Sequence, residues 1–165
     1  MEINLSSNWL GNVKRKPKKH EVLMWSIALP GFGQILNKQV LKGIVLIILE
    51  FLVNVQSNFN LGIMYSFRGE ISAASEVLNY QWLMFYPCLY MFAIWDAYQD
   101  ADGEVSDLAY LPFVFGAFFI TIGLMYSSKI VLFGILLGPV FLPMLFLIPG
   151  LLIGYIVRKI VVMVT

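Results

Sequence analysis

Long apolar runs dominate this chain, and its polar residues gather in the short segments between them. Four runs stand out, at residues 43–55, 80–98, 109–127 and 130–157. A helix needs about 20 mostly apolar residues to cross the hydrocarbon core of a bilayer, and the first run reaches that length only with its flanks. The pattern predicts an all-α, polytopic helical membrane protein with about four transmembrane helices. The last run is long enough to be either one kinked helix or two shorter pieces.

A further apolar stretch precedes these runs, but it is too short and too broken to cross as one straight helix. Residues 21–36 are interrupted by Pro30, Gly31 and Gly33. Proline removes a backbone donor and glycine permits left-handed turns, so both favour the end of a helix. We therefore predict an N-terminal half-helix or interfacial helix that ends at Pro30-Gly31.

The segments between the runs suggest loops and one bend. Residues 56–79 are polar and small, which predicts a loop with room for a short amphipathic helix. Pro87 predicts a kink within the second run, and membrane helices tolerate such kinks when neighbouring helices satisfy the freed backbone. Ser128 and Lys129 predict a tight turn between the last two spans.

Composition agrees with a membrane setting and narrows the chemistry. Of 165 residues, 59% are hydrophobic and 13% are charged, whereas a soluble domain carries roughly 25% charged residues. The single cysteine, Cys88, and the single histidine, His20, are too few for most metal sites. The motifs of common hydrolases, kinases and dinucleotide-binding enzymes are absent from the sequence. We predict a protein that is not an enzyme and has neither a metal nor a cofactor.

Basic residues gather on one side of the predicted topology. If residues 21–42 stay on the inner side, only Arg68 and Lys129 fall outside. Since positive charge favours cytoplasmic segments, we expect a multi-pass protein of the cell (plasma) membrane with both termini in the cytoplasm. The acidic loop at residues 99–108 then lies inside, beside the basic tail. The inner basic residues are Lys14, Arg15, Lys16, Lys18, Lys19, Lys38, Lys42, Arg158 and Lys159.

Two separated landmarks stand out in the first part of the chain, and together they resemble a known family. They are Leu29-Pro30-Gly31-Phe32-Gly33-Gln34 with Asn37 and Lys42-Gly43, and Trp95-Asp96-Ala97-Tyr98. The first resembles the "PGxGQ…KG" signature of small bacterial integral membrane proteins of the TM-two type, which is similar to one at the N-termini of some sugar-importer permeases. The second is an Asp near the end of the second helix of such domains. The resemblance covers residues 21–101, and it implies a membrane fold but little about activity. The chain departs from the family's pattern in one place, where Ile35-Leu36-Asn37 replaces the aromatic-basic turn.

Three parts of the chain follow from these patterns. Residues 1–20 form a basic cytoplasmic tail, residues 21–101 a TM-two-like membrane domain, and residues 102–165 a C-terminal transmembrane hairpin. The tail is too short to indicate binding of nucleic acid.

The signature residues also have a physical interpretation. Gly31, Gly33 and Gly43 would let helices approach closely, and Gln34 could satisfy the backbone groups freed by the Pro30 break. Asp96 could meet Lys42 or Lys38 at the start of the preceding helix. A role in helix packing is the interpretation that we prefer for this set: Pro30, Gly31, Gly33, Gln34, Lys42, Gly43 and Asp96.

Glu50 is a candidate intramembrane polar site. It lies within an apolar run, and Asn54 follows four residues later on the same helix face, so that the two side chains could share a hydrogen bond. An ionisable side chain in a membrane span is costly and is a functional hypothesis by default. The alternatives are a proton- or cation-coupling site, a polar contact with a partner helix, and an internal structural hydrogen bond.

The function predicted from these features is that of a non-enzymatic subunit or accessory of a larger membrane complex, with transport suggested by the permease resemblance. One alternative is a small self-assembling proton-coupled transporter that uses Glu50. Another is a lipid-binding membrane scaffold that uses the basic tail. The expected partners are the lipid bilayer and either a membrane-protein partner or further copies of this chain.

Overall fold

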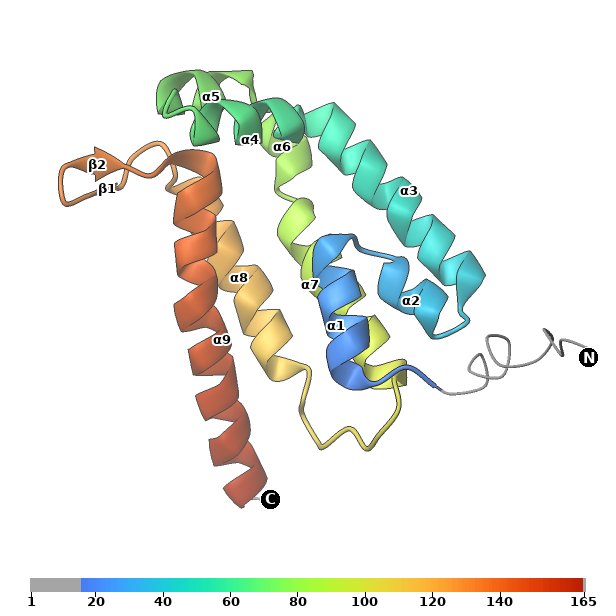
Figure 1. The fold of residues 1–165 in the computed structure, drawn as a ribbon. Coiled ribbons are helices and arrows are strands. Elements are labelled where there is room, and N and C mark those ends of the chain that lie inside the picture. The colour runs from blue at the N-terminus through green and yellow to red at the C-terminus, as the bar shows by residue number, and fades with distance from the viewer. Residues whose placement is uncertain (1–15, 165) are drawn as a thin grey trace, which may run out of the picture.

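The computed structural model describes residues 16–164 as a mostly helical fold (Figure 1), and the all-α prediction is confirmed at this level. Its one pair of strands within those residues is a two-residue ladder. The elements are α1 (Lys19–Ala28), α2 (Phe32–Leu36), α3 (Val40–Ser57), α4 (Phe59–Phe67), α5 (Ile71–Val77), α6 (Tyr80–Leu83), α7 (Tyr86–Asp100), α8 (Leu111–Met125), β1 (Val131–Leu132), β2 (Ile135–Leu136) and α9 (Gly138–Val164).

Helices α1 and α2 form a helical hairpin that starts and ends at the same end of the fold. Helix α1 stops at Ala28, two residues before Pro30, and Gly31 then adopts a left-handed φ of 104° that turns the chain into α2. Ten residues of α-helix rise about 15 Å, roughly half the thickness of a bilayer core. A short helix that ends just before Pro30-Gly31 is therefore present, as predicted, and it is followed by a short returning helix.

The longer helices run side by side and alternate in direction (Figure 1). Helix α3 runs toward one end of the fold, which α4, α5 and α6 cover. Helix α7 then runs back toward the other end, and α8 and α9 form an antiparallel pair. Glycines let α8 and α9 approach closely. A Cβ on Gly150 would lie 2.8 Å from the Phe115 oxygen, and one on Gly154 would lie 2.6 Å from Pro112 Cα. Small residues at such crossings are typical of helix pairs in membranes.

Within residues 16–164, two helices are long and apolar enough to cross a membrane, and both expose most of their apolar side chains. These are α3 and α9, whereas α8 is apolar but has only 15 residues. Length and composition therefore support membrane association. The prediction of four spans depends on α7 and α8 as well, and it is taken up below as a proposal.

The second predicted span is not one kinked helix. It is divided into α6 and α7, with a turn at Met84 and Phe85 between them. Pro87 stands in the first turn of α7, where its missing N–H would have no helical partner in any case. The predicted loop at residues 56–79 likewise consists mostly of two helices, α4 and α5.

The start of the last apolar run differs from the prediction. Residues 131–136 form an antiparallel β-hairpin in which Val131 pairs with Leu136. Phe133 and Gly134 form its turn, and both have a positive φ, as two-residue hairpin turns of type I′ require. Beyond it α9 is one helix and not two pieces, with Pro143 and Pro149 inside it.

The acidic loop contacts both ends of the described chain. The Asp102 N–H donates to the Pro17 oxygen at 3.0 Å, and the Lys19 Nζ donates to the Glu104 oxygen. Arg158 Nε on α9 donates to the Asp107 oxygen at 3.1 Å. The loop therefore lies beside residues 17–19, as predicted, although backbone oxygens make these contacts. Most of the basic tail, residues 1–15, lies outside the described residues.

Candidate functional site

The turn between α1 and α2 fits against the start of α3 because two glycines meet there. A Cβ on Gly31 would lie 2.5 Å from the Gly43 oxygen, and a Cβ on Gly43 would lie 2.7 Å from the Gly31 oxygen. Both distances are shorter than any real Cβ contact, and backbone atoms cannot rotate away as side chains do. The two glycines of the signature are thus needed for the same close approach.

Gly33 fills a second tight position, where α2 passes between α1 and α7. A Cβ at this position would lie 2.6 Å from Ala97 Cβ on α7 and 2.1 Å from Ser26 Oγ on α1. Val22 of α1 and Ala97 are themselves fully buried and belong to one hydrophobic cluster. The absence of a side chain on Gly33 allows the three helices to meet.

Gln34 and Lys42 hold Asp96 from two sides. Gln34 Nε2 donates to Asp96 Oδ2 at 2.9 Å and to the Ala93 oxygen at 2.8 Å. Lys42 Nζ lies 2.9 Å from Asp96 Oδ1. Gln34 is fully buried and Asp96 is 5% exposed, whereas the Lys42 side chain is 44% exposed. Of the two lysines considered from the sequence, Lys42 and not Lys38 pairs with Asp96.

The same contact surface extends along α7 by two hydrogen bonds that were not predicted. Asn37 Nδ2 donates to the Ala97 oxygen at 2.7 Å, and Gln39 Nε2 donates to Asp100 Oδ2 at 2.7 Å. Lys42 Nζ also approaches Asp100 at 3.6 Å. Asp100 follows Asp96 by four residues and so shares its helix face. The four-residue spacing is the feature of the sequence from which a second carboxylate beside Asp96 could have been predicted.

The sequence suggested that Gln34 would satisfy the backbone groups freed at the Pro30 break, but it does not. Its side chain reaches across to α7 instead, and Tyr90 of α7 supplies a donor to the end of α1. The Tyr90 hydroxyl donates to the Ile27 oxygen at 2.5 Å. A carbonyl in the last turn of a helix has no intrahelical partner, so this hydroxyl stabilises the turn between α1 and α2, which is called the hairpin tip below.

Glu50 lies on the face of α3 that is turned toward α7, where two tyrosine rings stack. The Tyr86 hydroxyl donates to Glu50 Oε1 at 3.0 Å, and the Tyr86 and Tyr90 rings stack with centroids 5.6 Å apart. Glu50 is 7% exposed, and its Oε2 has no hydrogen-bond partner. Asn54 Oδ1 is also buried without a partner, and the hydrogen bonds of the described residues include none between Glu50 and Asn54.

A cavity of about 260 Å³ adjoins this carboxyl group. It lies between the hairpin tip, α3 and the start of α4, so the chain brings three separate elements together around it. Sequence spacing could relate Glu50 to Asn54, but it could not place the hairpin tip beside them. The lining residues are Leu29, Ile47, Glu50, Phe51, Asn54, Val55 and Asn60.

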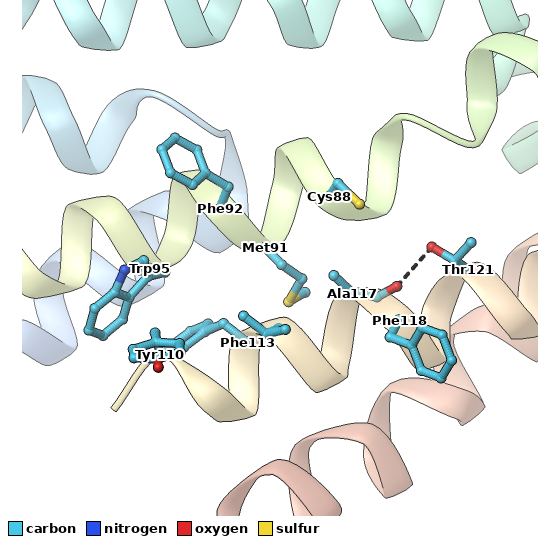
Figure 2. A pocket seen from close by; sticks show the side chains of 10 residues that line it. Cys88, Met91, Phe92, Trp95, Tyr110, Phe113, Ala117, Phe118 and Thr121 are labelled. Carbon is cyan, nitrogen blue, oxygen red and sulfur yellow. Dashed lines mark hydrogen bonds between the residues drawn. The ribbon is translucent and has the colours of Figure 1, made fainter. Parts of the chain in front are cut away.

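A second, larger hollow of about 440 Å³ lies between α7 and α8 and is almost entirely apolar. Figure 2 shows Trp95 and Phe92 on α7 at one side of it and Phe113 and Phe118 on α8 at the other. Thr121 Oγ1 donates to the Ala117 oxygen at 2.8 Å, so that its hydroxyl is satisfied within α8. The hollow offers shape and apolar contact, with few polar groups to orient a ligand.

No protein-family model, no curated protein and no solved structure matches this chain. Among the described residues, no group of three or more His, Cys, Asp or Glu side chains could hold a metal ion. The site is therefore defined by its own geometry. The α1–α2 hairpin is fastened to α7 at Asp96, and the buried carboxyl group of Glu50 lies beside a cavity at the tip of that hairpin.

Proposed function

We propose that this chain is a multi-pass cell-membrane protein that works as a non-enzymatic subunit or accessory of a larger membrane complex. Four spans, formed by α3, α6 with α7, α8, and α9, would cross the bilayer. The α1–α2 hairpin would enter from the cytoplasmic side and return to it. The resemblance to small bacterial membrane proteins of the TM-two type is part of this proposal.

The distribution of charge along the fold supports the placement. One end holds Lys38 and Lys42, the loop at residues 101–110 and the last turns of α9 with Arg158. The other end holds α4, α5 and the β-hairpin, with Arg68 and Lys129 near it. Since basic residues favour the cytoplasmic side, the first end is the inner one in this proposal.

The observation that carries the subunit role is that the polar side chains of the signature bind to one another inside the fold. Gln34, Lys42 and Asp96 join helices to one another, which leaves apolar surface as the main feature that the fold presents outward. That surface includes the outer faces of α3 and α9 and the hollow between α7 and α8. Lipid chains or the helices of a partner subunit would cover it.

The proposed topology predicts which positions can be labelled from outside the cell. In a Cys88→Ser background, Lys129→Cys should react in intact cells with a maleimide that cannot cross membranes. Asp107→Cys should react only after the cells are permeabilised. Both positions are exposed in the fold, so folding would not hide either of them. Labelling of Asp107→Cys in intact cells, or of neither position, would contradict the topology.

The subunit role is tested by purification of the full chain from native membranes in a mild detergent, with mass spectrometry and particle mass as readouts. A stoichiometric second membrane protein is the expected result. A particle that holds only copies of this chain would contradict the role and favour the second candidate.

That second candidate is a small self-assembling, proton-coupled transporter, and the unpaired Oε2 of Glu50 is the observation that favours it. A buried carboxyl group with one donor has an open position for a proton or another donor. Glu50→Gln would then abolish a proton-coupled flux while the chain still folds. The lipid-scaffold alternative depends on the basic tail, most of which lies outside the described residues.

A further inference from the structure

The cavity beside Glu50 has mostly apolar walls, and two of the residues that line it each hold a buried oxygen that lacks a donor. Leu29, Ile47 and Val55 supply aliphatic surface, and Phe51 supplies an aromatic ring. Glu50 and Asn54 line the same cavity from successive turns of α3, and Glu50 Oε2 and Asn54 Oδ1 have no partner. Each buried acceptor without a donor costs roughly 1–3 kcal/mol, so the arrangement favours a guest that donates hydrogen bonds.

No basic side chain of the described residues supplies these donors. The salt bridges among the described residues are both made by Lys42, and they go to Asp96 and Asp100 at the inner end of α7. The Tyr86 hydroxyl is already committed to Glu50 Oε1, and the Tyr90 hydroxyl to the Ile27 oxygen. A negative carboxylate at this position therefore has no compensating charge within the described fold.

We propose that this cavity binds a small lipophilic amine in its protonated, ammonium form. An ammonium group carries a positive charge and several N–H donors, so it could compensate the charge of Glu50, and it could donate to Glu50 Oε2 or Asn54 Oδ1 once these side chains turn toward the cavity. The apolar body of the amine would pack against the aliphatic walls, and the Phe51 ring face would attract the charge. The volume of about 260 Å³ suits a single small aromatic or branched aliphatic amine.

A bare metal ion fits this cavity less well than an amine. Calcium and magnesium take six or more oxygen ligands, whereas the lining offers one carboxylate and two side-chain amides amid apolar walls. The amine also has a route to the cavity. Phe51 is 65% exposed and Val55 is 52% exposed, so one wall faces the outer flank of α3, where a lipophilic cation would arrive through the bilayer.

The inference rests on the proposed placement of the chain in a bilayer, but not on a partner subunit or on transport. The two failures are distinguishable. A chain that alkaline carbonate extracts from membranes would overturn the proposed function. A chain that stays in the membrane but binds no amine would overturn only the present inference.

Calorimetric titration of phenethylamine into the full chain in phosphatidylglycerol nanodiscs tests the proposal, with empty nanodiscs subtracted. Saturable binding to the wild-type chain is expected, with propylbenzene, the neutral isostere, binding at least tenfold more weakly, which corresponds to about 1.4 kcal/mol. Glu50→Gln keeps the shape of the side chain and should weaken phenethylamine by at least tenfold. Glu76→Gln changes an exposed carboxylate on α5 and should leave binding within about twofold, because Glu76 does not line the cavity.

Equal binding of phenethylamine to the wild-type chain and to Glu50→Gln would overturn the proposal, and so would equal binding of propylbenzene. Absence of binding to the wild-type chain would overturn it too. Nanodiscs that contain phosphatidylethanolamine distinguish the source of the amine. Competition by that lipid would assign the site to a lipid headgroup, and unchanged binding would assign it to a free amine.

Discussion

Replacement of Gly31 by alanine should destabilise the protein by about 3 kcal/mol, from left-handed strain and overpacking together. The φ of 104° at Gly31 is costly for any residue with a Cβ, and the added methyl group would lie 2.5 Å from the Gly43 oxygen and 2.7 Å from Ile47 Cγ1. Ile47 can change rotamer, but the Gly43 oxygen moves only if α3 moves. The free energy of unfolding, measured in mixed micelles with increasing dodecyl sulfate and followed by tryptophan fluorescence, checks this result.

Gly69→Ala is the matched control for that variant. Gly69 also has a left-handed φ, 80°, but nothing lies within 4 Å of an added Cβ. Its substitution should therefore cost only the backbone strain, about 1–2 kcal/mol. If the two variants lost the same stability, the close approach of the hairpin turn to α3 would not contribute, and the packing argument for Gly31 and Gly43 would be wrong.

Asp96→Ala should cost roughly 2–3 kcal/mol, because it removes a buried charged acceptor from Gln34 and from Lys42. Gln34 would keep its hydrogen bond to the Ala93 oxygen, and Lys42 could turn toward water or headgroups. The same unfolding measurement applies. Asp107→Asn, at an exposed position in the loop, should change stability by less than about 0.5 kcal/mol.

Lys42→Met separates the two contacts that Asp96 makes. The Lys42 side chain is 44% exposed, and ion pairs in such settings contribute about 1 kcal/mol or less. We therefore expect Lys42→Met to cost clearly less than Asp96→Ala. Equal losses would mean that the ion pair, and not the buried hydrogen bond from Gln34, fastens the hairpin to α7.

Local backbone chemistry explains why several features could be predicted from the residues alone. Pro30 and Gly31 end α1 wherever the rest of the chain lies, because one lacks an N–H donor and the other accepts a positive φ. The apolar runs likewise predict α3, α8 and α9, since an apolar stretch of helical length has few other stable forms. Lys42 was expected near Asp96 because the predicted topology puts the start of one span and the end of the next on the same side of the membrane.

Contacts between distant segments could not be predicted in this way. The side chain of Gln34 had several possible acceptors in the sequence, and the packing of α2 against α7 selected Ala93 and Asp96. Likewise, a tyrosine in an apolar run carries no sign of the carbonyl it will reach, yet Tyr90 supplies the donor at the hairpin tip. Such pairings depend on which helices become neighbours.

The same distinction applies to the β-hairpin and to the cavity. Phe133 and Gly134 are a weak turn signal at the start of the last apolar run, and a piece as short as residues 131–136 is compatible with helix or strand. Glu50 was a candidate from its apolar flanks alone, because burial of a carboxyl group is costly in any fold. Its unpaired oxygen and the walls around it arise only when the hairpin tip, α3 and α4 converge, since a cavity is a property of neighbouring elements and not of any one segment.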